Sequence, residues 1–131
     1  MNSSPPASRR HGFRLMAWDG FVLAAGAAVS VWLWSMDHPL WWIVAMALGH
    51  FFLFCNVFLV WRRWELLWAG VFVANVVAHF ALGTISGLSV LLWQLPVTLG
   101  VIVWQIRSPW YHGIAARTLN PHLNDYLDGT L

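Results

Sequence analysis

Charge is what this sequence most lacks. Only 9% of its 131 residues are charged, whereas 60% are hydrophobic; an average soluble domain carries about 25% charged residues. So little charge leaves too little polar surface for a water-soluble globule. The same composition excludes a disordered chain, a coiled coil and a collagen-like fibre. The class that remains is an integral membrane protein.

Cysteine and lysine are also scarce. The single cysteine, Cys55, has no partner within the chain, which excludes an internal disulfide scaffold. Lysine is absent, so the seven basic residues are all arginines, and five acidic residues leave a formal net charge of only +2. We therefore expect no nucleic acid as a partner, because nucleic-acid binding needs a concentrated basic surface.

Four long apolar stretches are present, at residues 15–34, 40–61, 64–83 and 88–106. Each is close to the roughly 20 residues that a helix needs to cross a bilayer. They are apolar all round, which excludes the alternating strands of a membrane barrel, and their short connections require antiparallel neighbours. The sequence predicts an all-α integral membrane protein, an up-down antiparallel four-helix bundle over residues 15–106 with tails at 1–14 and 107–131.

The positions of the arginines predict the orientation of these helices. They precede the first stretch, separate the second from the third, and follow the fourth: Arg9, Arg10, Arg14, Arg62, Arg63, Arg107 and Arg117. Loops rich in arginine stay on the cytoplasmic side of a membrane. Both termini are therefore predicted to be cytoplasmic in a multi-pass protein of a bacterial-type inner membrane.

The two tails differ in pattern. The first tail, rich in serine, proline and arginine, is predicted to be disordered on its own, with its arginines near anionic lipid. In the second, Ser108-Pro109 and Asn120-Pro121 each place a helix-capping residue before a proline. This arrangement predicts short cytoplasmic helices over about residues 109–117 and 121–127, which lie on the inner leaflet or dock onto another subunit.

Tryptophan is unusually frequent, with 11 residues. Nine lie near the ends of the apolar stretches and are predicted to form an aromatic belt at the membrane surfaces: Trp18, Trp34, Trp41, Trp42, Trp61, Trp64, Trp68, Trp104 and Trp110. Trp32 and Trp93 lie deeper and are expected to pack against lipid or a neighbour, with a bound pigment, quinone or sterol as the alternative.

Small residues spaced about four apart mark the expected helix contacts. They are Gly20, Ala24 and Ala28 in the first stretch, Ala45 and Gly49 in the second, and Gly70, Ala74 and Ala78 in the third. Such residues let helices approach closely in lipid, where no hydrophobic force drives association. The pattern predicts contacts within this chain or with other membrane subunits, without saying which.

Four polar residues within the apolar stretches are the candidate cofactor-binding residues: His50, Asn75, His79 and Gln94. His50 is about 15 Å and His79 about 6 Å from the outer surface by helix rise, so the set is expected to gather in the outer half of the membrane. Neutral histidines bonded to carbonyls or amides are one interpretation. The others are ligation of haem or (bacterio)chlorophyll, and proton transfer or hydrogen bonding to a quinone. A metal site held by protein alone lacks a third strong ligand and is not predicted.

The acidic residues offer no catalytic set. Asp19 is expected to pair with Arg14 or Arg62, and Glu65 to be a solvated charge at the membrane surface. Neither a paired carboxylate within one stretch nor a nucleophile or phosphate-loop motif is present, so the chain is not expected to be an enzyme.

The sequence therefore predicts a non-catalytic accessory subunit of a larger membrane complex, with respiratory and photosynthetic complexes as candidates. It would contact neighbouring subunits, lipid or pigment. The first alternative is an electron-transfer protein that binds haem, chlorophyll or quinone through His50 or His79. The second is a small channel or transporter with a path past Asn75 and Gln94.

Overall fold

The computed structural model describes residues 9–131, and all regular secondary structure in that range is helical. Three helices are long and apolar enough to cross a membrane: α1 (Ala17–Ser35), α3 (Arg62–Ala81) and α4 (Gly87–Arg107). A shorter apolar helix, α2 (Trp41–Phe52), runs directly into the π-helix η1 (Leu53–Val57). Two short helices follow α4, namely α5 (Ala116–Leu119) and α6 (Leu123–Leu127).

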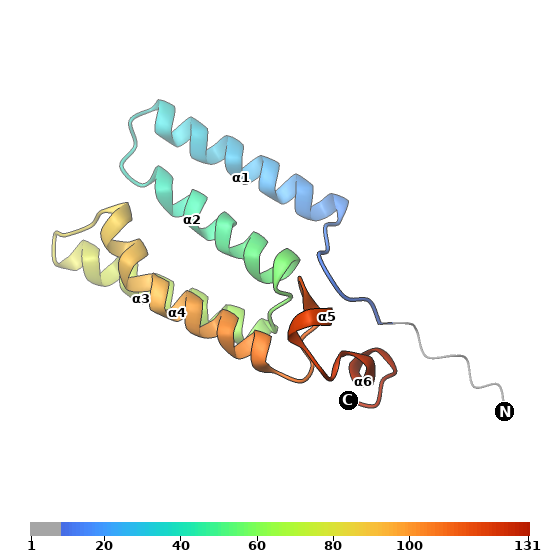
Figure 1. Cartoon of the computed structure of the whole chain (residues 1–131). Coiled ribbons are helices and arrows are strands. Elements are labelled where there is room, and N and C mark those ends of the chain that lie inside the picture. Colours follow the sequence, from blue (N-terminus) through green and yellow to red (C-terminus); the bar gives the residue numbers. More distant parts are fainter. Residues whose placement is uncertain (1–8) are drawn as a thin grey trace.

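The long helices form two antiparallel hairpins, α1 with α2 and α3 with α4 (Figure 1). The α2 helix lies between α1 and the second hairpin, and the described start of the chain lies at the same end of the helices as α5 and α6. In α1 only Ser30 is buried, where its hydroxyl donates to the carbonyl of Trp41 at 3.0 Å. A groove of about 640 Å³ runs along α2 and η1, with Val22 of α1 on one side and the start of α3 on the other. The predicted antiparallel order of neighbouring helices is present, and α1 packs on α2 as the outer helix.

The second apolar stretch, predicted to be helical over 40–61, leaves the helical conformation after Val57. Leu59 adopts a positive φ of 47°. Its carbonyl accepts from Nε2 of Gln105 at 3.0 Å, and the carbonyl of Val57 accepts from the N–H of Ile114 at 2.9 Å. These bonds to other segments take the place of the intrahelical bonds that would continue the helix. The next helix begins at Arg62, so the two arginines predicted as a loop form its first turn.

The apolar core lies between η1, α3 and α4. Phe54, Trp68 and Phe72 are buried there together with Val90 and Val101. The Trp68 ring is at the centre, stacked on Phe72 at 5.1 Å between centroids and meeting Phe54 edge-on at 5.7 Å. The core thus joins the end of the first hairpin to the second.

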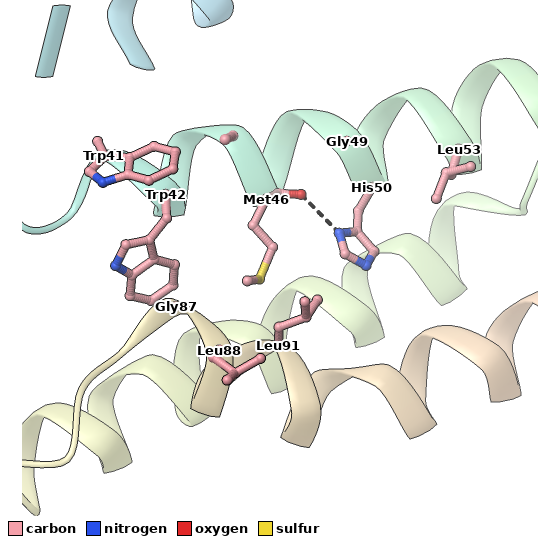
Figure 2. A pocket seen from close by; sticks show the side chains of 10 residues that line it. Trp41, Trp42, Met46, Gly49, His50, Leu53, Gly87, Leu88 and Leu91 are labelled. Atoms are coloured by element: carbon pink, nitrogen blue, oxygen red, sulfur yellow. Dashed lines mark hydrogen bonds between the residues drawn. The ribbon is translucent and has the colours of Figure 1, made fainter. Parts of the chain in front are cut away.

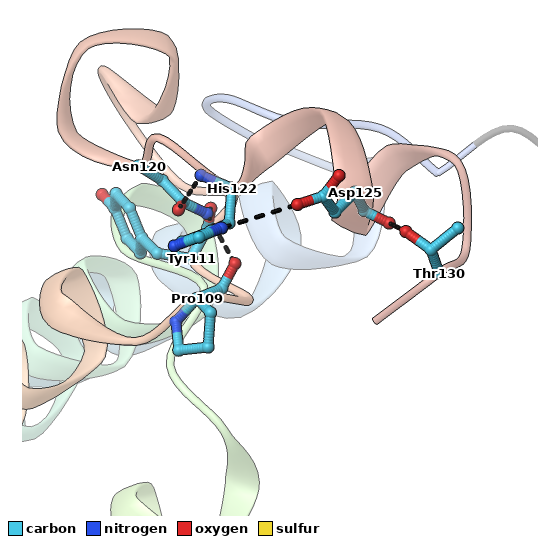
Figure 3. A network of polar contacts seen from close by, with 6 residues as sticks. All are labelled: Pro109, Tyr111, Asn120, His122, Asp125 and Thr130. Atoms are coloured by element: carbon cyan, nitrogen blue, oxygen red, sulfur yellow. Dashed lines mark hydrogen bonds and ion pairs between the residues drawn. The ribbon is translucent and has the colours of Figure 1, made fainter.

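The segment after α4 folds into a compact cap (Figure 3). Asn120 donates through Nδ2 to the carbonyls of Pro109 and Tyr111, at 2.8 and 2.7 Å. Tyr111 is fully buried, and its hydroxyl donates to the carbonyl of Ile114 at 2.8 Å. The helix predicted over 109–117 is therefore wrong: these carbonyls bond to side chains instead, and only Ala116–Leu119 is helical. The second short helix forms near its predicted place.

Residues 9–14 lie against this cap. Arg9 donates through Nη1 to the carbonyls of Tyr126 and Leu131, at 3.1 and 3.2 Å, and its guanidinium lies over the Tyr126 ring. The N–H of Gly12 donates to the carbonyl of His112 at 2.7 Å, and the N–H of Arg14 donates to the carbonyl of Asn56 at 3.0 Å. The cap therefore holds residues 9–14 of the tail that was expected to be disordered on its own. The rest of that prediction, for residues 1–8, lies outside the described residues.

The cap is expected to be less stable in acid because of His112. Burial lowers the pKa of His112 below its ordinary value of 6.5, and the positive charges of Arg14 and Arg9 lower it further, against a raising effect of its bond to the Trp110 carbonyl. The unfolded chain then binds the proton at higher pH than the folded chain. The contribution of His112 to stability is complete above about pH 6.5 and decreases as the pH falls below it.

The His112→Phe variant isolates this effect, since a phenyl ring keeps the stacking on Tyr126, whose ring lies 4.5 Å away. The free energy of unfolding is to be measured for both proteins from about pH 8 to about pH 5, the range in which histidine titrates. We expect the parent protein to lose more stability than the variant on acidification. Identical pH profiles would show that this side chain carries no proton-linked stability.

Candidate functional site

The polar residues between the helices form one connected group, which we call the polar seam: His50, Trp68, Asn75, Gln94 and Thr98. Nδ2 of Asn75 donates to Oε1 of Gln94 at 3.3 Å and to the carbonyl of Val90 at 2.9 Å. Nε2 of Gln94, which is fully buried, donates to the carbonyl of Trp68 at 3.2 Å. These bonds join α3 to α4.

Thr98 joins α2 to this pair of helices. Nδ1 of His50 lies 2.8 Å from the carbonyl of Met46, which accepts only, so Nδ1 carries the proton and Nε2 of the neutral ring is an acceptor. Oγ1 of Thr98 lies 3.0 Å from this Nε2 and receives the indole N–H of Trp68 at 2.9 Å. The His50 ring also stacks on Trp68, with 4.2 Å between centroids. Both ring nitrogens of His50 therefore have partners within the protein.

His79 lies at the edge of the seam. Its Nδ1 donates to the carbonyl of Asn75 one turn earlier, at 2.9 Å, and its side chain is half-buried. The structure thus joins Asn75 to Gln94, and Thr98 and Trp68 connect His50 to them, while His79 bonds only to the backbone of its own helix.

Trp68 corrects the prediction of an aromatic belt at that position. It is only 5% exposed, whereas Trp18, Trp34 and Trp104 are each more than half exposed. A sequence signal existed, because Trp68 precedes Asn75 by seven residues and Phe72 by four, which puts all three on one helix face. The apolar stretch alone did not show that its N–H would find Thr98.

A cavity of about 800 Å³ lies beside His50, between α2 and the start of α4 (Figure 2). Its lining is mainly apolar and includes Trp41, Trp42, Met46 and Leu91. Such a space suits an apolar ligand. A metal-centred cofactor would need the lone pair on Nε2 of His50, which lies 3.0 Å from Oγ1 of Thr98, so on ligation the Thr98 hydroxyl would donate to its other acceptor, the carbonyl of Gln94 at 3.2 Å. Among residues 9–131 no group of three or more histidine, cysteine, aspartate or glutamate side chains is placed to hold a metal ion.

The small residues predicted to pack helices together mostly face outward. A Cβ added to Gly20, Gly49 or Gly70 would meet nothing within 4 Å. The predicted alanines are likewise exposed: Ala24, Ala28, Ala45, Ala74 and Ala78. The close approach of α1 and α2 is instead at Gly26, where an added Cβ would overlap the side chain of Leu48. Most of these small residues therefore make no close helix contact within this chain.

The acidic residues near the cap end also differ from expectation. Oδ2 of Asp19 accepts from the N–H of Met16 at 2.9 Å and from Nδ2 of Asn56 at 3.1 Å. Oε1 of half-buried Glu65 accepts from Sγ of Cys55 at 3.1 Å. The predicted pairing of Asp19 with an arginine is wrong, because the backbone of Met16 and the side chain of Asn56 supply its partners. Glu65 is half-buried, with Cys55 as a hydrogen-bond donor. Within the described range the ion pair observed is His122 with Asp125, at 3.5 Å.

Comparison with known proteins found no matching family model, no matching curated protein and no matching solved structure.

Proposed function

We propose that this chain is a non-catalytic accessory subunit of a larger membrane complex, and that α3 contacts a neighbouring membrane subunit. The observation that carries the proposal is the division of α3 into two unlike faces. One face bears Trp68 and Asn75, whose polar groups bond within the chain. The other bears the stripe of Gly70, Ala74 and Ala78, which is exposed.

The outward stripe favours a protein neighbour over lipid alone. Lipid tails are as apolar as leucine, so a helix facing only lipid gains nothing from small side chains. A Cβ at Gly70 would find open space, so the folding of this chain does not require glycine there. A glycine in a helix costs about 1 kcal/mol relative to alanine. Close packing of a second helix against this stripe would explain why a glycine is present despite this cost.

We further propose that α2 with η1 is a fourth span and that both termini are cytoplasmic. The continuous apolar helix Trp41–Val57 is near the lower length limit for a span, about 17 residues. The arginines at the start of α3 and at the end of α4 lie at the cap end of the helices (Figure 1). Loops and tails bearing arginine are typical of the cytoplasmic side.

Replacing Gly70 with leucine is expected to break the association while leaving the chain folded. The added side chain enters open space in the isolated chain but would hold a neighbouring helix away. We expect the complex isolated from native membranes with a mild detergent to lose at least about tenfold of its content of this chain, as a loss of about 1.4 kcal/mol implies. Native gel electrophoresis and cross-linking measure this.

Gly20→Leu is the matched control, since Gly20 is also a helical glycine with nothing within 4 Å of an added Cβ but lies in α1. This variant is expected to stay in the complex. A parent chain that leaves native membranes as a free monomer would contradict the proposal. A chromophore that purifies with the chain and is lost in His50→Ala or His79→Ala would support the cofactor-binding alternative instead.

A further inference from the structure

A second feature lies at the cap end of α4, where the structure forms a slot of about 400 Å³. Gly100, Val103 and Arg107 lie along one side of α4 and form its floor, while Trp104 and Trp110 line it as well. Arg107 occupies the last turn of the helix and is exposed. The slot therefore runs from an apolar part of a membrane-length helix to a guanidinium group at its end.

Each of the two tryptophans that line the slot packs against another tryptophan. Trp110 stacks on Trp61 with 4.8 Å between centroids, and Trp104 packs against Trp64 at 5.6 Å. The guanidinium of Arg63 lies over both supporting rings, 4.8 Å from Trp61 and 5.4 Å from Trp64. The slot is thus bordered by indoles that pack on neighbouring rings, with a second cation next to them.

Arg107 forms no ion pair with a carboxylate of residues 9–131. Within residues 9–131 the ion pair observed is the one between His122 and Asp125. Of the acids at this end of the helices, Asp19 accepts from Asn56, Glu65 accepts from Cys55, and Asp125 pairs with His122. Arg107 therefore remains available for an anion, and a guanidinium binds phosphate oxygens through paired N–H donors.

The floor of the slot distinguishes a lipid from a small soluble anion. A Cβ on Gly100 would meet nothing within 4 Å, so the helix has a notch there. Val103 and Trp104 beside the notch are 44% and 58% exposed. A free phosphate would leave these apolar surfaces uncovered, whereas an acyl chain attached to the same headgroup would cover them.

We infer that this slot binds one anionic phospholipid, with its phosphate on Arg107 and an acyl chain along the notch at Gly100. Tryptophan at the headgroup level suits this placement, because indole combines an apolar ring with an N–H donor. The site requires that the chain lie in a membrane, but it does not depend on the association proposed for α3. It adds a specific lipid to the general attraction between arginines and anionic leaflets.

The test is native mass spectrometry of the full chain in detergent with equal amounts of phosphatidylglycerol and phosphatidylcholine that carry the same acyl chains. We expect one retained phosphatidylglycerol per chain. Arg107→Gln is expected to lower the phosphatidylglycerol-to-phosphatidylcholine ratio by about tenfold, the size of one charge-assisted hydrogen bond. Gly100→Leu is expected to reduce retention of both lipids, because it fills the notch.

Arg62→Gln is the control for net charge, since Arg62 is exposed at the same end of the helices but does not line the slot. Its ratio should equal that of the parent chain. An equal fall in Arg62→Gln and Arg107→Gln would overturn the inference in favour of a diffuse field. Equal retention of the two lipids by the parent, or no retention, would also overturn it. The Gly70→Leu chain should retain lipid normally, so either proposal can fail without the other.

Discussion

Replacing Thr98 with valine is expected to lower the free energy of unfolding by about 2 kcal/mol. Oγ1 of Thr98 receives the indole N–H of Trp68 at 2.9 Å and lies 3.0 Å from Nε2 of His50. Valine has a similar shape but no hydroxyl, so the indole N–H of Trp68 and Nε2 of His50 would remain buried without this hydrogen-bond partner. Leaving a buried polar group unpaired costs about 1–3 kcal/mol. The packing of α2 against the second hairpin should therefore be the first contact to weaken in this variant.

The measurement is reversible unfolding in mixed micelles, followed by tryptophan fluorescence and circular dichroism. Thr84→Val is the matched control, because Thr84 is exposed in the turn between α3 and α4. We expect that variant to stay within about 0.5 kcal/mol of the parent. Equal stability of Thr98→Val and the parent would show that the polar seam does not hold these helices together.

Replacing Gly113 with alanine is expected to destabilise the cap by about 3 kcal/mol, the upper range for overpacking. An added Cβ would lie 2.8 Å from the carbonyl oxygen of Val57 and 2.9 Å from the carbonyl carbon of Phe58. Backbone atoms cannot move aside as a side-chain tip can. The shift would strain the bond between Ile114 and Val57, which is 2.9 Å long and ties the cap to the end of η1.

Limited proteolysis is the direct measurement, with cleavage expected to begin within residues 109–131 at lower protease concentration than in the parent. Gly26→Ala is a graded comparison, because the atoms nearest to its Cβ belong to the side chain of Leu48 rather than to the backbone. Gly100→Ala serves as the open control and should gain about 0.5–1 kcal/mol through helix propensity. Equal protease resistance of Gly113→Ala and Gly100→Ala would contradict the close contact.

The predicted helices differ in how well their sequence determined them. The stretches 15–34, 64–83 and 88–106 correspond to α1, α3 and α4 within about two residues at each end, because long apolar runs have few other structures in lipid. The contacts within the candidate site were only partly predictable from the sequence. The shared face of Asn75 and His79 follows from helix periodicity, whereas the pairing of Trp68 with Thr98 needs the relative positions of two helices.

The sequence by itself determined the class of this protein: little charge, long apolar runs and arginines at one end require helices suited to a membrane. Only the tertiary structure decided where the second run ends. Residues 58–61 are apolar and contain neither proline nor glycine, so nothing local predicts a break. The break forms because Gln105 and Ile114 supply donors to the carbonyls of Leu59 and Val57. A carbonyl buried in apolar surroundings must be paired, and distant segments provide that pairing here.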